Sequence, residues 1–186
     1  MRLPGSRHRF AGPLVGLGLL ALTAGVTASA TAADGAAHAG ARIVDGAGHT
    51  IGWARLTEDA SGQLHLNVQV AGLAPGRHGV HLHAIGRCVG PAFVSAGGHH
   101  NPLGAEHGLD NPAGAHAGDL PNLTVNGAGR GHLDAISHHA TLSAGPVSLL
   151  DADGSAIVIH ANEDDQVTNP TGNSGARIAC GVIEAG

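Results

Sequence analysis

Seven residues of the types that ligate metals stand in two groups along this chain. A His-x-His pair lies in an apolar run, a looser group lies in a glycine-rich stretch, and one histidine follows far downstream; in order they are His81, His83, His99, His107, His116, Asp119 and His160. Four imidazole nitrogens favour copper, whereas three imidazoles with one carboxylate favour tetrahedral zinc. The residue types therefore predict two metals with few ligands to spare.

Histidine frequency by itself carries little weight, because the chain contains 15 histidines. At that frequency roughly one His-x-His pair arises by chance. The prediction therefore depends on the strands and loops that bring these residues together.

Alternating apolar and polar residues predict strands through most of the chain after residue 40. The clearest run places Leu64, Leu66, Val68 and Val70 between polar residues, which is typical of a half-buried strand. Similar patterns predict strands over residues 42–45, 51–57, 77–85, 131–136, 155–161 and 177–183. Short strands divided by glycine-rich turns predict an all-β sandwich or barrel.

Side-chain alternation predicts where the histidines of the strands point. Val80 and Leu82 suit the core face of their strand, so His81 and His83 lie on the opposite face. The same alternation places His160 outside the barrel wall. The stretch from residue 86 to about 125 has no regular pattern and is long for a loop, which indicates either a functional role or a misassigned segment. We expect this loop to fold over the histidines and bring its own ligands to them.

Residues 1–30 are expected to be a signal peptide. Arg2, Arg7 and Arg9 precede an uncharged run over residues 11–33, and small residues follow the apolar part. Basic, apolar and small-residue zones in this order are typical of secretion. An uncleaved anchor is the alternative, because the run is long enough to span a bilayer. We expect residues 31–40 to form a flexible leader and residues 41–186 a single domain that has no stable membrane insertion once the signal is removed. Export would take it to the periplasm, the cell wall or the medium.

The cysteines and the charge balance indicate how the domain is stabilised and which partners are unfavourable. Cys88 and Cys180 in an exported chain predict a disulfide that closes a loop of about 92 residues, contributing on the order of 4 kcal/mol; two buried free thiols are the alternative. Without the three arginines of the signal segment, six arginines and no lysine face fourteen acidic residues, a net charge near −8. Nucleic acid and anionic membranes are poor partners for such a surface.

Several motifs in one order resemble the copper/zinc superoxide dismutase family, in its exported bacterial form. They are Gly-Val-His-Leu-His over residues 79–83, Ser-Ala-Gly-Gly-His-His-Asn-Pro over 95–102, His-Ala-Gly-Asp over 116–119, His160, and Gly-Asn-Ser-Gly-Ala-Arg-Ile-Ala-Cys-Gly-Val-Ile over 172–183. The resemblance covers most of residues 42–186. It implies an eight-stranded Greek-key β-barrel, an immunoglobulin-like sandwich with long metal-binding loops.

The resemblance also implies a role for each site residue. Copper would bind His81, His83, His99 and His160, and zinc would bind His99, His107, His116 and Asp119, with His99 bridging the two metals. Arg177 matches the family's anion-guiding arginine, Asp164 matches a carboxylate that links a copper ligand to a zinc ligand, and Cys88 and Cys180 match its disulfide. His100 leaves an ambiguity of one residue, which the following Asn101 and Pro102 resolve toward His99.

The implied reaction converts two superoxide anions and two protons to oxygen and hydrogen peroxide. Copper would cycle between Cu(II) and Cu(I), the imidazolate of His99 would take up and pass on a proton, and zinc would remain structural. The loop after His160 is short and acidic, unlike the basic loop of many family members, which leaves the speed of the reaction open. The alternative is a non-enzymatic copper- or zinc-binding module, a buffer or chaperone-like domain on the same barrel. Monomer and homodimer both remain open.

Overall fold

The computed structural model describes residues 37–186, so the expected signal peptide lies outside the described residues. The described part is built from strands and one short 3-10 helix, in agreement with the expected all-β class. The strands are β1 (Ala37–Asp45), β2 (Thr50–Glu58), β3 (Leu64–Ala71), β4 (Gly76–His78), β5 (Val80–His83), β6 (Leu123–Val125), β7 (Arg130–Ser137), β8 (Ala156–His160), β9 (Arg177–Val182) and β10 (Glu184–Ala185), and the helix is η1 (Val94–Ala96).

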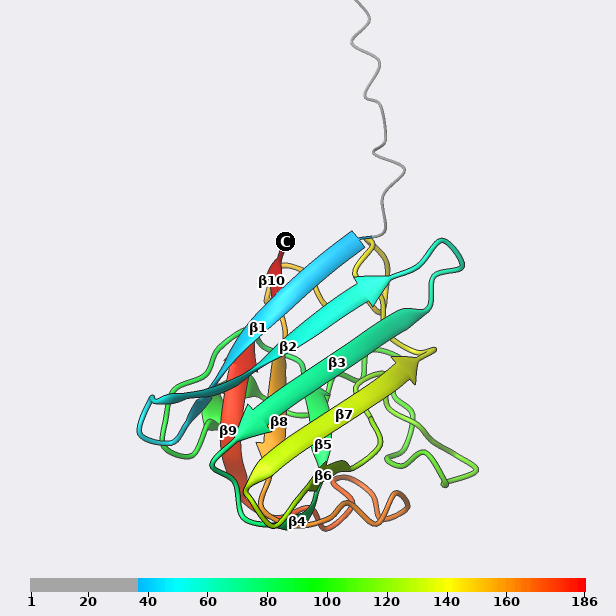
Figure 1. The fold of residues 1–186 in the computed structure, drawn as a ribbon. Coiled ribbons are helices and arrows are strands. Elements are labelled where there is room, and N and C mark those ends of the chain that lie inside the picture. Colours follow the sequence, from blue (N-terminus) through cyan, green and yellow to red (C-terminus); the bar gives the residue numbers. More distant parts are fainter. Residues whose placement is uncertain (1–36) are drawn as a thin grey trace, which may run out of the picture. The chain divides into compact units, whose positions relative to one another are not determined.

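These strands pair antiparallel in the order β4-β6-β7-β3-β2-β1-β9-β8-β5, and β10 also pairs antiparallel with β1 (Figure 1). The two ends of this order, β4 and β5, are consecutive pieces of one run, so the sheet closes into a barrel. Since β9 and β10 are also consecutive pieces, the ten segments form the eight runs of the expected Greek-key barrel.

The run that carries two of the histidines is interrupted at Gly79, whereas alternation predicted one continuous strand over 77–85. The N–H of Gly79 donates to Asn162 O (2.8 Å), and its carbonyl accepts from the N–H of His160 (2.9 Å). A Cβ on Gly79 would lie 2.8 Å from Cβ of Ser174. The break therefore lets the loop after β8 approach the barrel wall closely.

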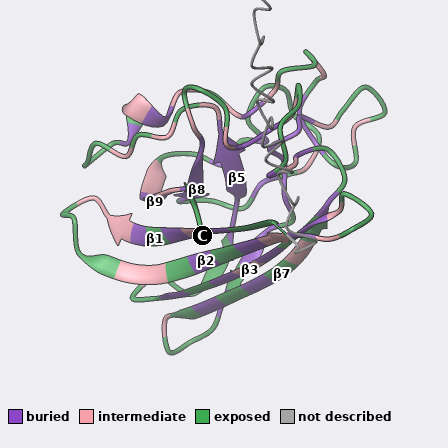
Figure 2. Ribbon diagram, turned by 90° about the horizontal axis from the view of Figure 1, so that it is seen from above, coloured by how far each residue is buried: buried purple, intermediate pink, exposed green. Residues whose placement is uncertain are grey.

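Burial separates the two halves of the barrel. Strands β1, β2, β3 and β7 alternate between buried and exposed residues, whereas every residue of β5 and β8 is buried (Figure 2). On their inner face Val80, Leu82, Ile157 and Ile159 join the main core. Their outer face is covered by the long loop, as the alternation of the sequence predicts.

Two differences concern short or weakly patterned segments. Strand β1 begins at Ala37 rather than at residue 42, within the segment expected as a leader, because backbone pairing with β2 and β10 holds Ala37 to Gly40 despite their low strand propensity. Strand β6, only three residues long, lies at the end of the stretch that had no pattern. It pairs with β4 and β7 and closes that side of the barrel.

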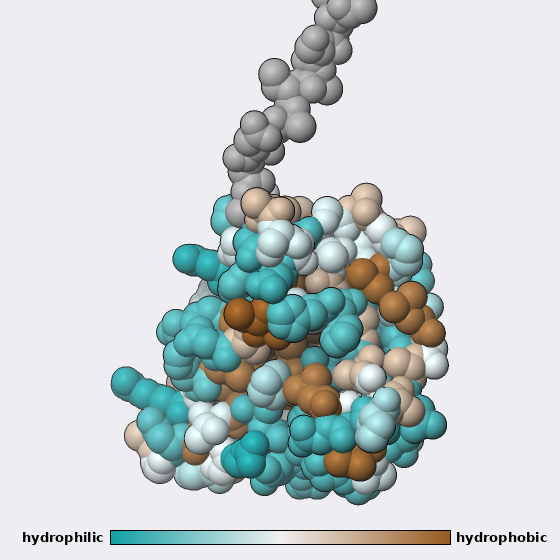
Figure 3. Space-filling view, turned by 90° about the vertical axis from the view of Figure 1, so that its right-hand side faces the viewer, coloured by the Kyte–Doolittle hydropathy of each residue, from teal (hydrophilic) through white to brown (hydrophobic). Residues whose placement is uncertain are grey.

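A second, smaller core cluster of Phe93, Ala96, Ala156, Val158 and Cys180 lies apart from the main core, and further hydrophobic residues are exposed on the surface. On the face drawn in Figure 3, hydrophobic side chains lie in patches among hydrophilic ones. The large exposed hydrophobic residues of the described part are Trp53, Ile85, Val89, Val94, Leu103, Leu109, Ile136 and Val167. Within residues 37–186 no helix has the length and apolar character needed to cross a membrane.

Candidate metal centre

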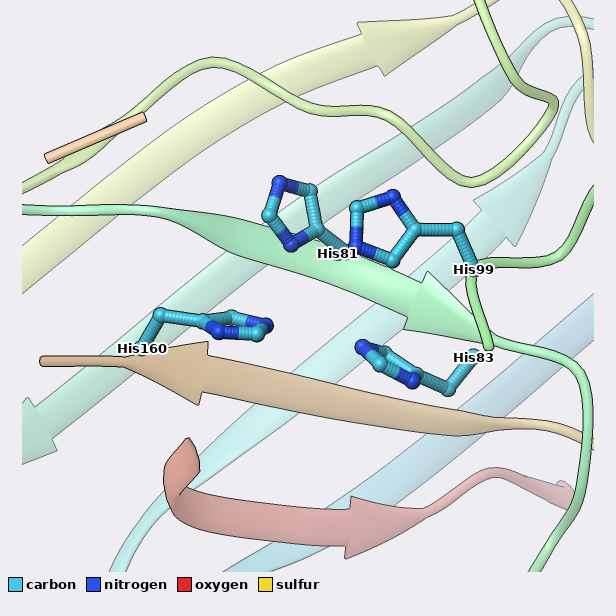
Figure 4. A group of neighbouring side chains, drawn as sticks. All are labelled: His81, His83, His99 and His160. Carbon is cyan, nitrogen blue, oxygen red and sulfur yellow. The ribbon is translucent and has the colours of Figure 1, made fainter. Parts of the chain in front are cut away.

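Four histidines from three segments converge outside the wall formed by β5 and β8. His81 and His83 project from β5, His160 from the end of β8 and His99 from the long loop, and their rings lie close together in Figure 4. One ring nitrogen of each lies within 4.8 Å of those of the other three. Imidazole–metal bonds of about 2 Å place opposite ligands of a planar site about 4 Å apart. The copper cluster, as we call these four residues, is compact enough for one ion.

Hydrogen bonds orient two of these rings. His83 Nδ1 donates to the carbonyl oxygen of Gly97 (3.0 Å), and His160 Nδ1 donates to that of Gly175 (3.1 Å). The opposite nitrogen of each ring, Nε2, is buried and has no hydrogen-bond partner among the described residues. A histidine that donates from Nδ1 keeps a lone pair on Nε2, so both lone pairs are available to a metal.

The other two rings contribute the same kind of orphaned atom. His81 Nδ1 and His99 Nε2 are buried without a partner in the described part of the chain. Burial lowers the pKa of His81 to about 3, that of His83 to about 2 and that of His160 to about 4, so these rings are neutral near pH 7. Buried polar atoms are normally satisfied. Four orphaned nitrogens in one place therefore fit a copper ion as their missing partner.

A second cluster forms around one oxygen of Asp119. Asp119 Oδ1 lies 3.1 Å from His99 Nδ1, 3.0 Å from His107 Nδ1 and 3.3 Å from His116 Nδ1. The Nδ1 atoms of His99 and His116 are 3.2 Å apart. Ligands held at about 2.0–2.1 Å on a tetrahedral zinc lie about 3.3 Å from one another. The four atoms of this zinc cluster therefore have the spacing that zinc requires.

The carboxylate of the zinc cluster is fixed by its second oxygen. Asp119 Oδ2 accepts hydrogen bonds from the backbone N–H groups of Gly108 and His116, each at 2.9 Å. Burial opposes ionisation, but hydrogen bonds from His107 and His99 outweigh it and hold the pKa of Asp119 far below its usual range. The site thus contains a permanent negative charge that partly neutralises a zinc ion.

His81 lies near both clusters, since one of its nitrogens is within 4.8 Å of ligand atoms of His99, His107 and Asp119. Two observations favour His116 as the fourth member of the zinc cluster. His116 Nδ1 has the tetrahedral spacing to both His99 and Asp119. His81 Nε2 is occupied by a carboxylate, whereas its Nδ1 is buried without a partner among the described residues.

That carboxylate belongs to Asp164, which touches one histidine of each cluster. His81 Nε2 donates to Asp164 Oδ2 (2.5 Å), and His107 Nε2 donates to Asp164 Oδ1 (3.1 Å). Burial opposes ionisation of Asp164, but these two hydrogen bonds outweigh it and lower its pKa well below the usual value. A buried carboxylate in this position fixes the tautomers of both rings and raises their basicity as ligands.

The long loop is tied to β5 by backbone pairing. His83 pairs with His99 and His81 pairs with Asp119 in isolated antiparallel bridges. Between them, Leu82 donates its N–H to Gly118 O and accepts from the N–H of His100, both at 2.8 Å. Because the loop adds to the free edge of β5, the ligands of the loop take their positions from the barrel.

Arg177 lies beside the copper cluster and is held by the loop that the disulfide closes. Its Nη1 donates to Phe93 O (2.8 Å) and its Nη2 to Gly97 O (2.6 Å). The expected disulfide between Cys88 and Cys180 is present and joins this loop to β9. Both hydrogen bonds leave the guanidinium directed at a cavity of about 600 Å³, whose lining includes His83, His99, His116, His160 and Arg177. The copper cluster is thus reached from the side on which Arg177 stands.

The structure brings together all the site residues that the sequence indicated. It also distinguishes His99, which lies in the site, from the adjacent His100, which does not. His100 is buried, but it belongs to neither cluster. Two contributions to the site could not be recognised from the sequence. Phe93 acts through its backbone carbonyl, which no side-chain motif reveals. Asn122, in a triplet that matches a glycosylation sequon, binds the backbone of Asp164 instead.

Comparison with known proteins agrees with this geometry. A family model described as copper/zinc superoxide dismutase (SODC) matches residues 50–183. The copper/zinc superoxide dismutase 2 of Aquifex aeolicus is 43% identical over 145 residues, which are 77% of this chain and 84% of the relative. That of Caulobacter vibrioides is 44% identical over 142 residues, 75% and 81% of the two chains. The crystal structure of a double mutant of a SOD-like protein from Bacillus subtilis matches with a TM-score of 0.74 and 43% identity, covering 77% of this chain and 95% of that one.

The family match over most of the folded domain and the identity to two curated relatives lead to one conclusion. The chain belongs to the copper/zinc superoxide dismutase family, an enzyme class that acts on superoxide with copper and zinc as cofactors.

Proposed function

We propose that this chain dismutates superoxide outside the cytoplasm, with copper on His81, His83, His99 and His160 and zinc on His99, His107, His116 and Asp119. The observation that carries the proposal is the position of a single ring. His99 Nδ1 lies 3.1 Å from Asp119 Oδ1, its Nε2 is buried without a partner among the described residues, and one nitrogen of the ring is within 4.8 Å of nitrogens of the other three copper-cluster histidines. A ring that presents one nitrogen to each cluster has the position of a bridging imidazolate.

Copper, when bound, supplies one-electron exchange between Cu(II) and Cu(I), so that one superoxide is oxidised to oxygen and another is reduced to peroxide. His99 serves the proton balance of the second half, since its Nε2 can hold a proton while its Nδ1 stays in the zinc cluster. We assign one proton of hydrogen peroxide to His99 and the other to solvent. His81, His83 and His160 stay neutral because burial lowers their pKa values.

Arg177 draws the anion into the cavity and positions it. Of the residues that line this cavity, Arg177 alone carries a formal charge. Its two hydrogen bonds to backbone carbonyls hold the guanidinium in place, which a flexible ammonium group would not achieve.

The sequence of the loop after His160 is acidic, which suggested that the loop would repel an incoming anion. Its acidic side chains, however, do not oppose the positive field of Arg177 in the cavity. Glu163 is paired with Arg77 (2.5 Å). Asp165 accepts hydrogen bonds from its own loop, among them the N–H of Thr168 (2.8 Å). The third acid, Asp164, is turned inward, and none of the three lines the cavity. The loop offers neutral groups such as Thr171 to the incoming anion, and focusing by Arg177 and the metals prevails over the net charge of the chain.

Export and assembly complete the proposal. The disulfide supports a location outside the reducing cytoplasm, and the expected signal peptide over residues 1–30 would deliver the protein to the periplasm, the cell wall or the medium. Removal of that segment leaves no stable membrane insertion. We propose that the mature protein is a monomer or a homodimer. Light scattering on the purified mature protein would distinguish the two states.

The test is to purify the mature protein, determine its copper and zinc content, and measure superoxide removal. We expect about one copper and one zinc per chain, with activity that depends on copper. Stoichiometric copper without activity would instead support the metal-buffer alternative. A His160→Ala variant that keeps full activity would refute the assignment of the copper cluster.

A further inference from the structure

The side chain of Asp164 touches His81 of the copper cluster and His107 of the zinc cluster, and its own backbone is held by a residue outside both clusters. The side chain of Asn122 forms two hydrogen bonds with it. Asn122 Nδ2 donates to Asp164 O, and the N–H of Asp164 donates to Asn122 Oδ1, both at 2.8 Å. The side-chain amide thus pairs with the backbone of Asp164 as a neighbouring strand would.

Asn122 is itself rigidly placed. It is only 8% exposed and directly precedes β6, whose Leu123 and Val125 are buried in the main core. It also follows Asp119 by three residues, so one short segment carries a member of the zinc cluster and the contact to Asp164. Gln166 adds a parallel link, since its Nε2 donates to Leu120 O (3.2 Å).

The carboxylate of Asp164 has little freedom once its backbone is fixed. A Cβ on Gly172 would lie 1.8 Å from Asp164 Oδ1 and 2.6 Å from His107 Nε2, so the loop packs tightly against this contact. A shift of the Asp164 backbone therefore changes its distances to His81 and His107 rather than being absorbed by empty space.

We propose that Asn122 is a positioning residue for both metals, acting through Asp164 on His81 and His107. The inference rests on the proposed metal assignment. An amide of this length is needed, because it donates to the carbonyl and accepts from the N–H at once. Aspartate cannot donate, and serine can reach only one of the two groups.

The same hydrogen bonds bear on whether the Asn-Leu-Thr triplet of residues 122–124 can be glycosylated. A glycan on Asn122 would replace one hydrogen of a buried Nδ2 that already donates to Asp164. The triplet is therefore a metal-site element and not a glycosylation site. This provides a matched control, since Thr124 is exposed and its replacement destroys the triplet while leaving the amide intact.

The experiment compares wild type with Asn122→Ala, Asn122→Ser and Thr124→Ala. Zinc affinity is measured by chelator competition, and the unfolding temperature is measured with and without metals. We expect Asn122→Ala to weaken zinc binding about tenfold and to lower the unfolding temperature of the loaded protein more than that of the metal-free protein. Asn122→Ser should lie between, and Thr124→Ala should match wild type. If the alanine variant does not fold, the serine variant carries the same comparison.

Equal losses in the loaded and metal-free forms, with unchanged zinc affinity, would reduce Asn122 to a packing residue and overturn the inference. A glycan found on Asn122 by intact mass of protein from its native source would also overturn it. Failure of wild type to bind copper and zinc would refute the proposed function instead, so the two are distinguishable.

Discussion

His160 and Arg177 are register partners in the antiparallel ladder of β8 and β9. The register shifts between Ile159 and His160, one residue before this pair. Both side chains line the same cavity, so the irregularity ends the regular ladder where the site begins. A candidate copper ligand and the candidate anion guide are thus set by one strand pair.

Replacing Arg177 should slow catalysis without removing metal. Arg177→Gln removes the charge of the cavity, and we expect activity to fall about tenfold with unchanged copper and zinc content. Arg177→Lys should recover only part of the loss, because an ammonium group cannot bond both Phe93 O and Gly97 O in the same fork. Initial rates at several salt concentrations are the measurement. Wild-type rates in Arg177→Gln would contradict the role of guide.

The adjacent residues His99 and His100 provide a matched pair of variants that test whether His99 bridges the two metals. His99→Ala should lose copper and weaken zinc strongly, since this ring presents a nitrogen to each cluster. His100→Ala should keep both metals, because its ring belongs to neither. Metal analysis after gel filtration separates the two variants. Retention of both metals in His99→Ala would exclude a bridging role.

The metal-free protein should lose stability on the acid side of pH 6.5. Burial lowers the pKa of His83 to about 2 and that of His160 to about 4, whereas in the unfolded chain both lie near 6.5. As the pH falls, the unfolded chain takes up these protons first, so stability declines from pH 6.5 toward pH 4 and below.

His107 has the opposite effect on the alkaline side. Burial disfavours its charged form, but Asp119 and Asp164 outweigh burial and raise its pKa to about 9. Its contribution is complete below pH 6.5 and is lost as the pH rises through 9. Calorimetry of the metal-free protein should therefore show a maximum of the unfolding temperature near neutrality. A His160→Gln variant should flatten the acid branch, and an unchanged acid branch would contradict the assigned cause.

Charge changes in the loop after His160 should depend on whether the side chain faces the cavity. Glu163→Gln should change the rate less than about twofold, because Glu163 is exposed, paired with Arg77 and absent from the cavity wall. Thr171→Lys places a positive charge on that wall and should raise the rate severalfold, with a steeper decline in salt. Stopped-flow rates against ionic strength test both. A larger effect from Glu163→Gln than from Thr171→Lys would refute the argument.

Loss of the disulfide should affect stability and the placement of Arg177 together. Cys88 and Cys180 are 92 residues apart, and closing such a loop contributes on the order of 4 kcal/mol in the chain-entropy model. We expect the paired Cys88→Ser, Cys180→Ser variant to unfold at a markedly lower temperature. At temperatures where it remains folded, its rate should fall toward that of Arg177→Gln, since the loop with Phe93 is released. Full activity in this double variant would show that the loop closed by the disulfide is not needed to hold Arg177 in place.

Much of the barrel could be predicted because its strands alternate. Strand β3 and the faces of β5 follow from the positions of Leu64, Leu66, Val80 and Leu82 alone. Strand β6 could not be predicted, since three residues are too few to establish a period. The early start of β1 depends on pairing with β2 and the end of the chain, which local propensity does not contain.

The candidate site could be predicted where side-chain type carries the chemistry. Histidines, the two aspartates and Arg177 have chemistry that a sequence displays. The carbonyl groups of Phe93 and Gly97 could not be found, because every residue has one and only the fold decides where it points. Asn122 was visible only as a common triplet, and its partner lies 42 residues away.

The double burial of β5 couples assembly of the barrel to metal content. Because core residues and ligands alternate along this strand, a slip of one residue would turn Val80 and Leu82 toward the metals and His81 and His83 into the core. Such a chain would lose its packing and its ligands at once. The packed core and the metal ligands therefore depend on one and the same strand register.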